Sequence, residues 1–64
     1  MDVMIHRVKR IEQHTRIFPG RQGCHAFSER KFEFHCEDGS IVTVTAFADK
    51  IDALTVHDLG QEVV

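Results

Sequence analysis

The feature that most constrains the fold is a pair of short alternating segments joined by a Glu-Asp-Gly tripeptide at 37–39. Residues 31–36 alternate between polar and apolar side chains, and residues 41–47 do so less regularly. Both segments are rich in strand-forming residue types, so the pattern predicts two antiparallel strands. Gly39 suits the left-handed position of a three-residue hairpin loop. The sequence therefore predicts a β-hairpin over residues 30–48.

The register of this hairpin follows from the positions of its phenylalanines. A three-residue loop pairs them with valines, whereas a two-residue Asp-Gly loop would shift the register by one and set them beside threonines. We therefore expect one face to carry Phe32, Phe34, Cys36, Val42, Val44 and Ala46. The opposite face is only partly polar and carries Lys31, Glu33, His35, Ile41, Thr43, Thr45 and Phe47. Because its apolar residues could contact a second copy, both a monomer and a homodimer are compatible with the sequence.

A helix is predicted for the first eleven residues. Strand alternation fails at Arg7 and Lys9, whereas a helical three-four spacing of apolar residues holds throughout. The residues that follow this spacing are Met1, Met4, Ile5, Val8 and Ile11. Because β-branched side chains lower helix propensity, a strand at the N-terminus is the alternative.

The segments on either side of the hairpin are less regular. Residues 17–23 contain a proline and two glycines and are predicted to form a surface loop. Residues 24–27 are expected to add a short third strand at the edge of the hairpin. After the hairpin, Asp49 is placed to cap a helix through Leu59, with Gly60 as its stop. Residues 54–56 also alternate like a strand, so that helix has a strand as its alternative.

The predicted fold class is therefore α+β in a single domain over residues 1–64. It consists of a small antiparallel sheet built on the 30–48 hairpin, an N-terminal helix and a short C-terminal helix. No apolar run has the length of a signal peptide or of a membrane span, so we expect a cytoplasmic protein with reduced thiols. Two cysteines permit one disulfide at most, which is not the pattern of a disulfide-dense secreted domain.

Charge is divided unevenly along the chain. Seven of the eight lysines and arginines lie in residues 1–31, and seven of the ten acidic residues follow them, so the two parts carry +4 and −6. An acidic surface suits docking onto a basic groove of a larger protein or nucleoprotein complex. We expect it to be formed by Glu33, Glu37, Asp38, Asp49, Asp52, Asp58 and Glu62.

The basic N-terminal part supports an alternative, a small nucleic-acid-binding or regulatory protein. On the predicted helix, Arg7, Arg10 and His14 would share one face that could contact phosphates. The residues of this alternative surface are Arg7, Arg10, Arg16 and Arg21. A net charge of −2 argues against direct nucleic-acid binding.

A second alternative is a zinc-stabilised structural module, because cysteine and histidine are the ligands that zinc prefers. The candidate ligands are Cys24, His25, His35 and Cys36. Their spacing is poor, since adjacent residues on a strand point to opposite faces. We therefore predict no metal and no other cofactor. The five histidines lie in no catalytic signature, so an enzyme is not predicted either.

In its length, its hairpin with the 37–39 tripeptide at the tip, its terminal elements and its acidic residues, the chain resembles the short accessory proteins of phages and mobile elements, including anti-CRISPR inhibitors. The resemblance implies a non-enzymatic inhibitor that binds stoichiometrically in the host-cell cytoplasm. Several such proteins mimic DNA by presenting carboxylates to a DNA-binding channel of a defence complex of the CRISPR type. The basic N-terminal part of this chain departs from that pattern.

Overall fold

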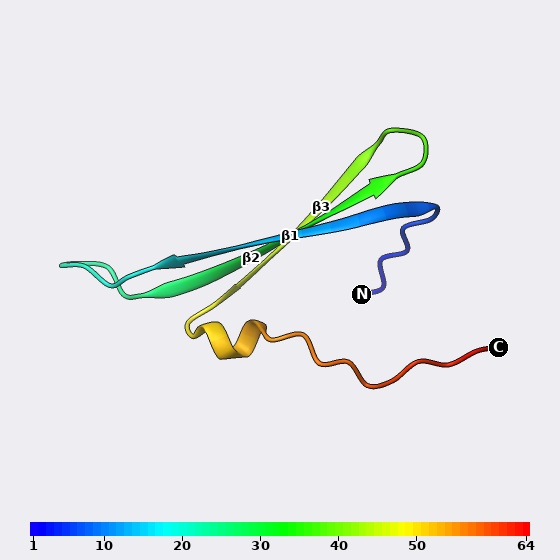
Figure 1. Cartoon of the computed structure of the whole chain (residues 1–64). Coiled ribbons are helices and arrows are strands. Elements are labelled where there is room, and N and C mark those ends of the chain that lie inside the picture. The colour runs from blue at the N-terminus through cyan, green and yellow to red at the C-terminus, as the bar shows by residue number, and fades with distance from the viewer.

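A computed structural model describes all 64 residues as one antiparallel sheet of three strands. The strands are β1 (Val8–Phe18), β2 (Phe27–Cys36) and β3 (Ile41–Ala48), and they follow one another in the sheet in the order β1-β2-β3. A single 3₁₀ turn, η1 (Ile51–Leu54), comes after β3. The chain after η1 runs beside the sheet to the C-terminus without forming a further element (Figure 1).

The predicted hairpin is confirmed, with the predicted register. Phe32 lies opposite Val44 and Phe34 lies opposite Val42. Because side chains alternate along a strand, this pairing places the phenylalanines and valines on one face of the sheet. β2 begins earlier than expected, at Phe27, and so includes the end of the segment that was predicted as a separate short strand.

The turn between β2 and β3 is the predicted three-residue loop. The backbone N–H of Cys36 donates to the carbonyl of Ser40 at 2.9 Å, and the N–H of Gly39 donates to the carbonyl of Cys36 at 3.0 Å. Gly39 has φ +90°, a conformation that costs other residues steric strain. Asp38 accepts from the backbone N–H of Ser40 at 2.9 Å, which fixes the tip of the loop.

The predicted N-terminal helix is wrong, because residues 8–18 form the edge strand β1. A β-bulge between Val8 and Arg10 inserts one extra residue into β1. The bulge leaves Val8 and Ile11 on the same face although they are three positions apart, and this spacing is also that of a helix. β-branched residues favour the strand, as the alternative interpretation held.

The chain before β1 forms no regular element. It turns sharply at Arg7, whose φ of +57° is uncommon for a residue with a side chain. The Arg7 carbonyl accepts from the N–H of Glu37 at 3.0 Å, so this corner is tied to the β2–β3 turn.

The connection between β1 and β2 is a loop at residues 19–26, later than the predicted loop because Ile17 and Phe18 end β1. Its tip is closed by two backbone hydrogen bonds between Arg21 and Cys24, of 2.9 and 2.8 Å. Gly23, which lies within this tip, has φ +83°.

The predicted C-terminal helix through Leu59 is also wrong. The structure has only the single turn of η1, which starts after Lys50 and has no side-chain cap, so Asp49 does not cap it. Thr55 has an extended backbone, and Val56 belongs to no regular element, consistent with the low helix propensity of β-branched residues.

The fold is therefore an all-β sheet and not the predicted α+β arrangement. No helix is long or apolar enough to cross a membrane.

Little of this sheet is buried. Only three of the 64 residues are buried, namely Ser28, Glu29 and Cys36, and two of these are polar. A packed core normally consists of apolar side chains covered on all sides. The sheet therefore has a core on neither of its faces.

Replacing Gly39 with valine should destabilise the fold by about 1–2 kcal/mol, because a branched side chain resists the left-handed conformation. A Cβ at this position meets no atom within 4 Å, so the loss would come from the backbone alone. Gly39→Asn is the matched control, since asparagine tolerates this conformation, and it should lose clearly less. Urea unfolding of the three chains measures the difference. Equal stability of G39V and the wild type would contradict the loop geometry.

Candidate functional site

The two faces of the sheet differ sharply in chemistry. One of them, named here the apolar face, receives alternate residues of β1, β2 and β3. Its apolar members are Val8, Ile11, Ile17, Phe32, Phe34, Cys36, Val42, Val44, Ala46 and Ala48. Several are openly exposed: Ile11 by 57%, Ile17 by 65% and Val44 by 41%. This is the largest set of exposed apolar side chains that the sheet presents together.

The two ends of the apolar face are partly covered by the chain itself. At one end, Val3 and Ile5 of the N-terminal segment border a groove of about 360 Å³. The rest of the groove is lined entirely by apolar residues of the sheet, namely Val8, Ile11, Phe34 and Val44. At the other end, η1 packs against β2 and β3. The N-terminal segment and η1 lie on the same side of the sheet in Figure 1, and the chain after η1 also runs along this side toward the C-terminus.

Arg30 is the one charged strand residue whose register places it among the apolar-face positions of β2. Its guanidinium is held by two internal partners. The Nε donates to the Thr15 hydroxyl at 3.0 Å, and Nη1 donates to the carbonyl of Leu54 in η1. Arg30 thus anchors η1 to the sheet through hydrogen bonds to two neutral acceptors.

The opposite face, named here the polar face, carries charges of both signs. Its charged and hydroxyl residues are Arg10, Glu12, His14, Arg16, Glu29, Lys31, Glu33, His35, Thr43 and Thr45. Arg16 donates to both carboxylate oxygens of Glu29, at 3.3 and 3.1 Å, and Glu29 is buried. Antiparallel pairing of β1 with β2 therefore places Arg10 and Arg16 of the predicted basic surface on the same face as Glu33 of the predicted acidic surface.

An aromatic cluster lies at one end of the polar face. The rings of Phe18 and Phe27 stack with centroids 4.5 Å apart, and Phe47 follows at 6.3 Å from Phe27. Arg16 lies over the Phe18 ring at 5.1 Å, a cation–π contact. The cluster closes this end of the polar face, although Phe47 remains 64% exposed.

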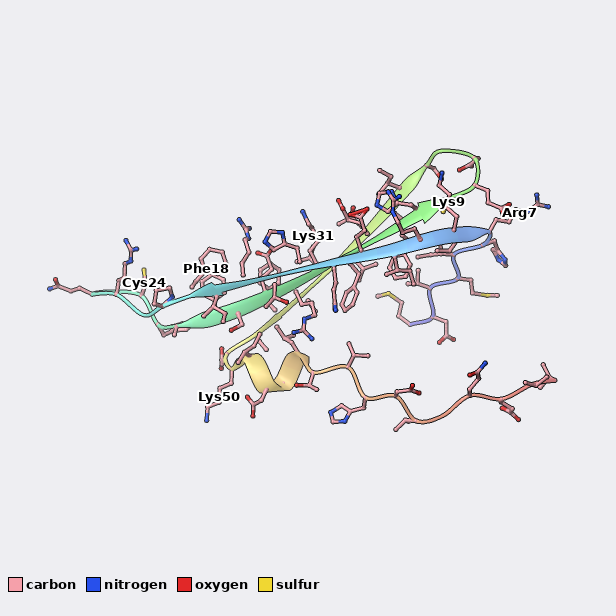
Figure 2. The ribbon with its side chains drawn as sticks, viewed as in Figure 1. Arg7, Lys9, Phe18, Cys24, Lys31 and Lys50 are labelled. Atoms are coloured by element: carbon pink, nitrogen blue, oxygen red, sulfur yellow. The ribbon has the colours of Figure 1, made fainter.

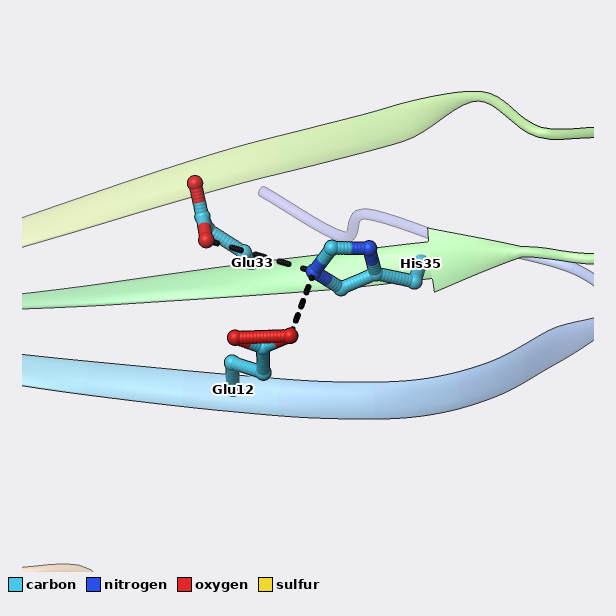
Figure 3. Close-up of side chains that lie close together, drawn as sticks. All are labelled: Glu12, Glu33 and His35. Atoms are coloured by element: carbon cyan, nitrogen blue, oxygen red, sulfur yellow. Dashed lines mark ion pairs between the residues drawn. The ribbon is translucent and has the colours of Figure 1, made fainter.

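The densest group of titratable side chains on the polar face consists of Glu12, Glu33 and His35 (Figure 3). His35 Nε2 lies 3.2 Å from a Glu12 oxygen and 3.9 Å from a Glu33 oxygen. Neither contact has the alignment of a hydrogen bond, so Nε2 is buried without a hydrogen-bond partner. Glu12 and Glu33 are directly opposite in the register, where like charges repel.

These three residues offer potential cation ligands that lie within 4.8 Å of one another. The same Glu12 oxygen that contacts His35 is also 2.9 Å from Nε of Arg10. The guanidinium already neutralises that carboxylate and would repel a second cation. The group is therefore best described as an ion-pair network on an open sheet surface.

The predicted acidic residues are not brought together on one surface. Glu37 and Asp38 lie in the β2–β3 turn, whereas Asp49 lies beyond the opposite end of β3, near Asp52 in η1. Asp58 and Glu62 are in the exposed C-terminal segment, and Glu33 is on the polar face beside His35.

The predicted basic residues are also dispersed. Arg7 lies at the corner before β1 and Arg21 in the loop after it, at opposite ends of the molecule (Figure 2). Arg10 and Arg16 share the polar face, but each faces a carboxylate, at 2.9 and 3.1 Å. The helical face that would have joined Arg7, Arg10 and His14 does not exist.

The cysteine and histidine residues considered for zinc lie at opposite ends of β2. Cys24 and His25 precede the strand in an exposed loop, and His35 and Cys36 end it. Both thiols are free, and Cys36 is buried while Cys24 is exposed. The structure does not bring these four side chains together as a zinc site would require.

The apolar contribution of β1 was missed by the sequence reasoning. After the bulge, alternation resumes and places Ile11, Thr15 and Ile17 on one face. This alternation, together with β-branching at all three positions, is the signal that could have revealed the strand.

The β2–β3 turn alters the acidity of Asp38. Hydrogen bonds from the Ser40 hydroxyl, at 2.6 Å, and then from its backbone N–H lower the pKa of Asp38 below its ordinary value. Ser40→Ala should therefore raise this pKa part of the way back, because the backbone donor remains. An NMR titration of the Asp38 carboxyl carbon measures it, with Thr43→Ala as the control. An unchanged pKa in S40A would contradict the loop geometry.

The sign of the pH effect follows from that lowered pKa. A carboxyl group that is more acidic when folded stabilises the fold above its unfolded pKa, and this contribution is lost as the pH falls through the folded pKa. S40A should thus make the urea midpoint less dependent on pH in the acidic range.

Replacing Glu33 with glutamine should stabilise the fold by about 0.2–1 kcal/mol at low ionic strength, because it removes one of two facing charges. The gain should shrink in 1 M salt, where the Debye length is about 3 Å. Glu62→Gln, in the exposed C-terminal segment, is the control and should leave stability unchanged. A loss in E33Q would mean that attraction between Glu33 and His35 outweighs the repulsion.

Comparisons with known proteins give no relative. No family model matches the sequence, no curated protein matches it, and no solved structure matches its fold.

Proposed function

We propose that this chain is a non-enzymatic binding protein that acts by stoichiometric contact of its apolar face with another polypeptide. The observation that carries the proposal is the exposed apolar face of a sheet in which only three of 64 residues are buried. Contiguous apolar surface that a protein leaves open is typical of a site for another macromolecule. Such contact makes a protein an inhibitor when it covers a functional surface of its partner.

Contact through acidic residues alone receives less support. A carboxylate surface that enters a basic nucleic-acid groove would need its charges on one side of the molecule. Here Asp38 and Asp52 lie beyond opposite ends of β3, so the seven carboxylates form no single patch. They are better suited to steering and solubility around a contact that the apolar face provides.

The apolar face has the anatomy of an interface. Interfaces have an apolar centre and a polar rim. Val44 and Phe32 lie opposite one another near the middle of the strands, while Lys9 in the bulge and Lys50 before η1 lie well apart, on either side of that middle (Figure 2). A partner bound to the apolar face would therefore contact apolar side chains at the centre of the interface and charged side chains at its margin.

Photo-crosslinking in the native host tests the proposal. The full chain would carry p-benzoylphenylalanine in place of Val44, on the apolar face, or in place of Thr43, its neighbour on the polar face. Adducts, including those with a second copy, should form from position 44 and be at least tenfold weaker from position 43. Absence of adducts from position 44, or equal adducts from both positions, would contradict the proposal.

A further inference from the structure

We infer that the polypeptide covering the apolar face is a second copy of this chain, and that the two sheets pack face to face as a twofold-symmetric β-sandwich. The inference rests on the proposed function, because it names the partner of the apolar face. Three observations support it: the area left exposed, the lack of charged side chains around Val44 and the way the two ends of the face are bordered.

The exposed area is too large for a folded chain of this size. A compact monomer of 7.4 kDa exposes about 4,200 Å², whereas this chain exposes 5903 Å². Its radius of gyration is 15.0 Å, against about 10.7 Å for a compact domain of 64 residues. The excess is about 1,700 Å² per chain.

This excess is large enough for a stable dimer. Part of it belongs to the extended residues after η1, including the exposed Val56 and Leu59. A standard interface buries about 800 Å² per partner, so about half of the excess would be enough to form one. One copy placed on the apolar face would therefore supply the burial that the isolated sheet lacks.

The region of the apolar face formed by Phe32, Phe34, Val42 and Val44 favours an identical partner because it carries no charged side chain. Arg30, the one charged residue among the strand positions of this face, lies opposite Thr15 and Ala46, and its guanidinium donates to the Thr15 hydroxyl and to the carbonyl of Leu54. Around Val44, therefore, no charge repels a second copy or selects a partner of opposite charge. In a twofold interface the same patch serves both subunits, so this apolar region is self-complementary by composition.

The borders of the apolar face set how two copies would meet. The N-terminal segment and η1 lie on the same side of the sheet, toward its two ends, and the chain after η1 runs along that side (Figure 1). Two sheets pack about 10 Å apart through interdigitating side chains. We place the contact around Phe32 and Val44, near the middle of their strands, with Ile11 and Ile17 of β1 at its margins.

Sedimentation equilibrium of the purified full chain tests this inference. The wild type should have twice the chain mass of 7.4 kDa at micromolar concentration. Val44→Asp should weaken dimerisation at least 100-fold, because it buries a charge in the interface. Thr45→Asp, one residue along on the polar face and opposite Lys31, should remain dimeric. Dimers that persist equally in V44D would overturn the face-to-face arrangement and indicate pairing through the edges of β1 or β3.

If V44D does not fold, urea unfolding of the wild type at two protein concentrations still tests whether the chain dimerises. A chain that folds as a dimer gains stability with concentration, so its urea midpoint should rise when the protein is concentrated 100-fold. A midpoint independent of concentration, together with the mass of a monomer, would overturn the inference. The proposed function would then still stand if position 44 crosslinks to other proteins, and it would fail if position 44 crosslinks to nothing.

Discussion

Pairing of β2 on both of its edges is the interaction on which the rest of the structure depends. β2 is the central strand, and its register with β1 and β3 decides which side chains share a face. The β-bulge at Val8 adjusts β1 so that Ile11 lies over Phe34, on the same side as Val44. Without that extra residue, β1 would present its charged side chains to the apolar face.

A sheet of three strands has two faces and no second layer to cover either. Here the polar face carries ion pairs between charged side chains, and in the Arg16–Glu29 pair the glutamate is buried. The other face is mainly apolar, with Gln13, Thr15, Ser28 and Arg30 as its polar members and with the N-terminal segment and η1 at its ends. A chain of this size buries a smaller share of its surface than a larger domain does. A partner that covered this face, as proposed, would therefore also stabilise the sheet.

The central hairpin could be predicted from sequence because it depends on local information. Alternation at 31–36 and the positive φ that Gly39 supplies select one loop length, and that loop fixes the register. β1 could not be predicted in the same way. Its bulge produces a three-residue spacing from Val8 to Ile11 that local periodicity assigns to a helix, and only pairing with β2 reveals the inserted residue.

Charge along the chain was also a poor guide to the site. The division of +4 and −6 is a property of the sequence, and antiparallel pairing disperses it, because it places Glu33 of the acidic part on the same face as Arg10 and Arg16 of the basic part. The sequence by itself determined the hairpin, its register and the apolar side of β2 and β3, because these follow from side-chain alternation and turn chemistry. Only the tertiary structure decided that β1 completes this face and that the carboxylates lie apart, because both depend on contacts between residues distant in the chain.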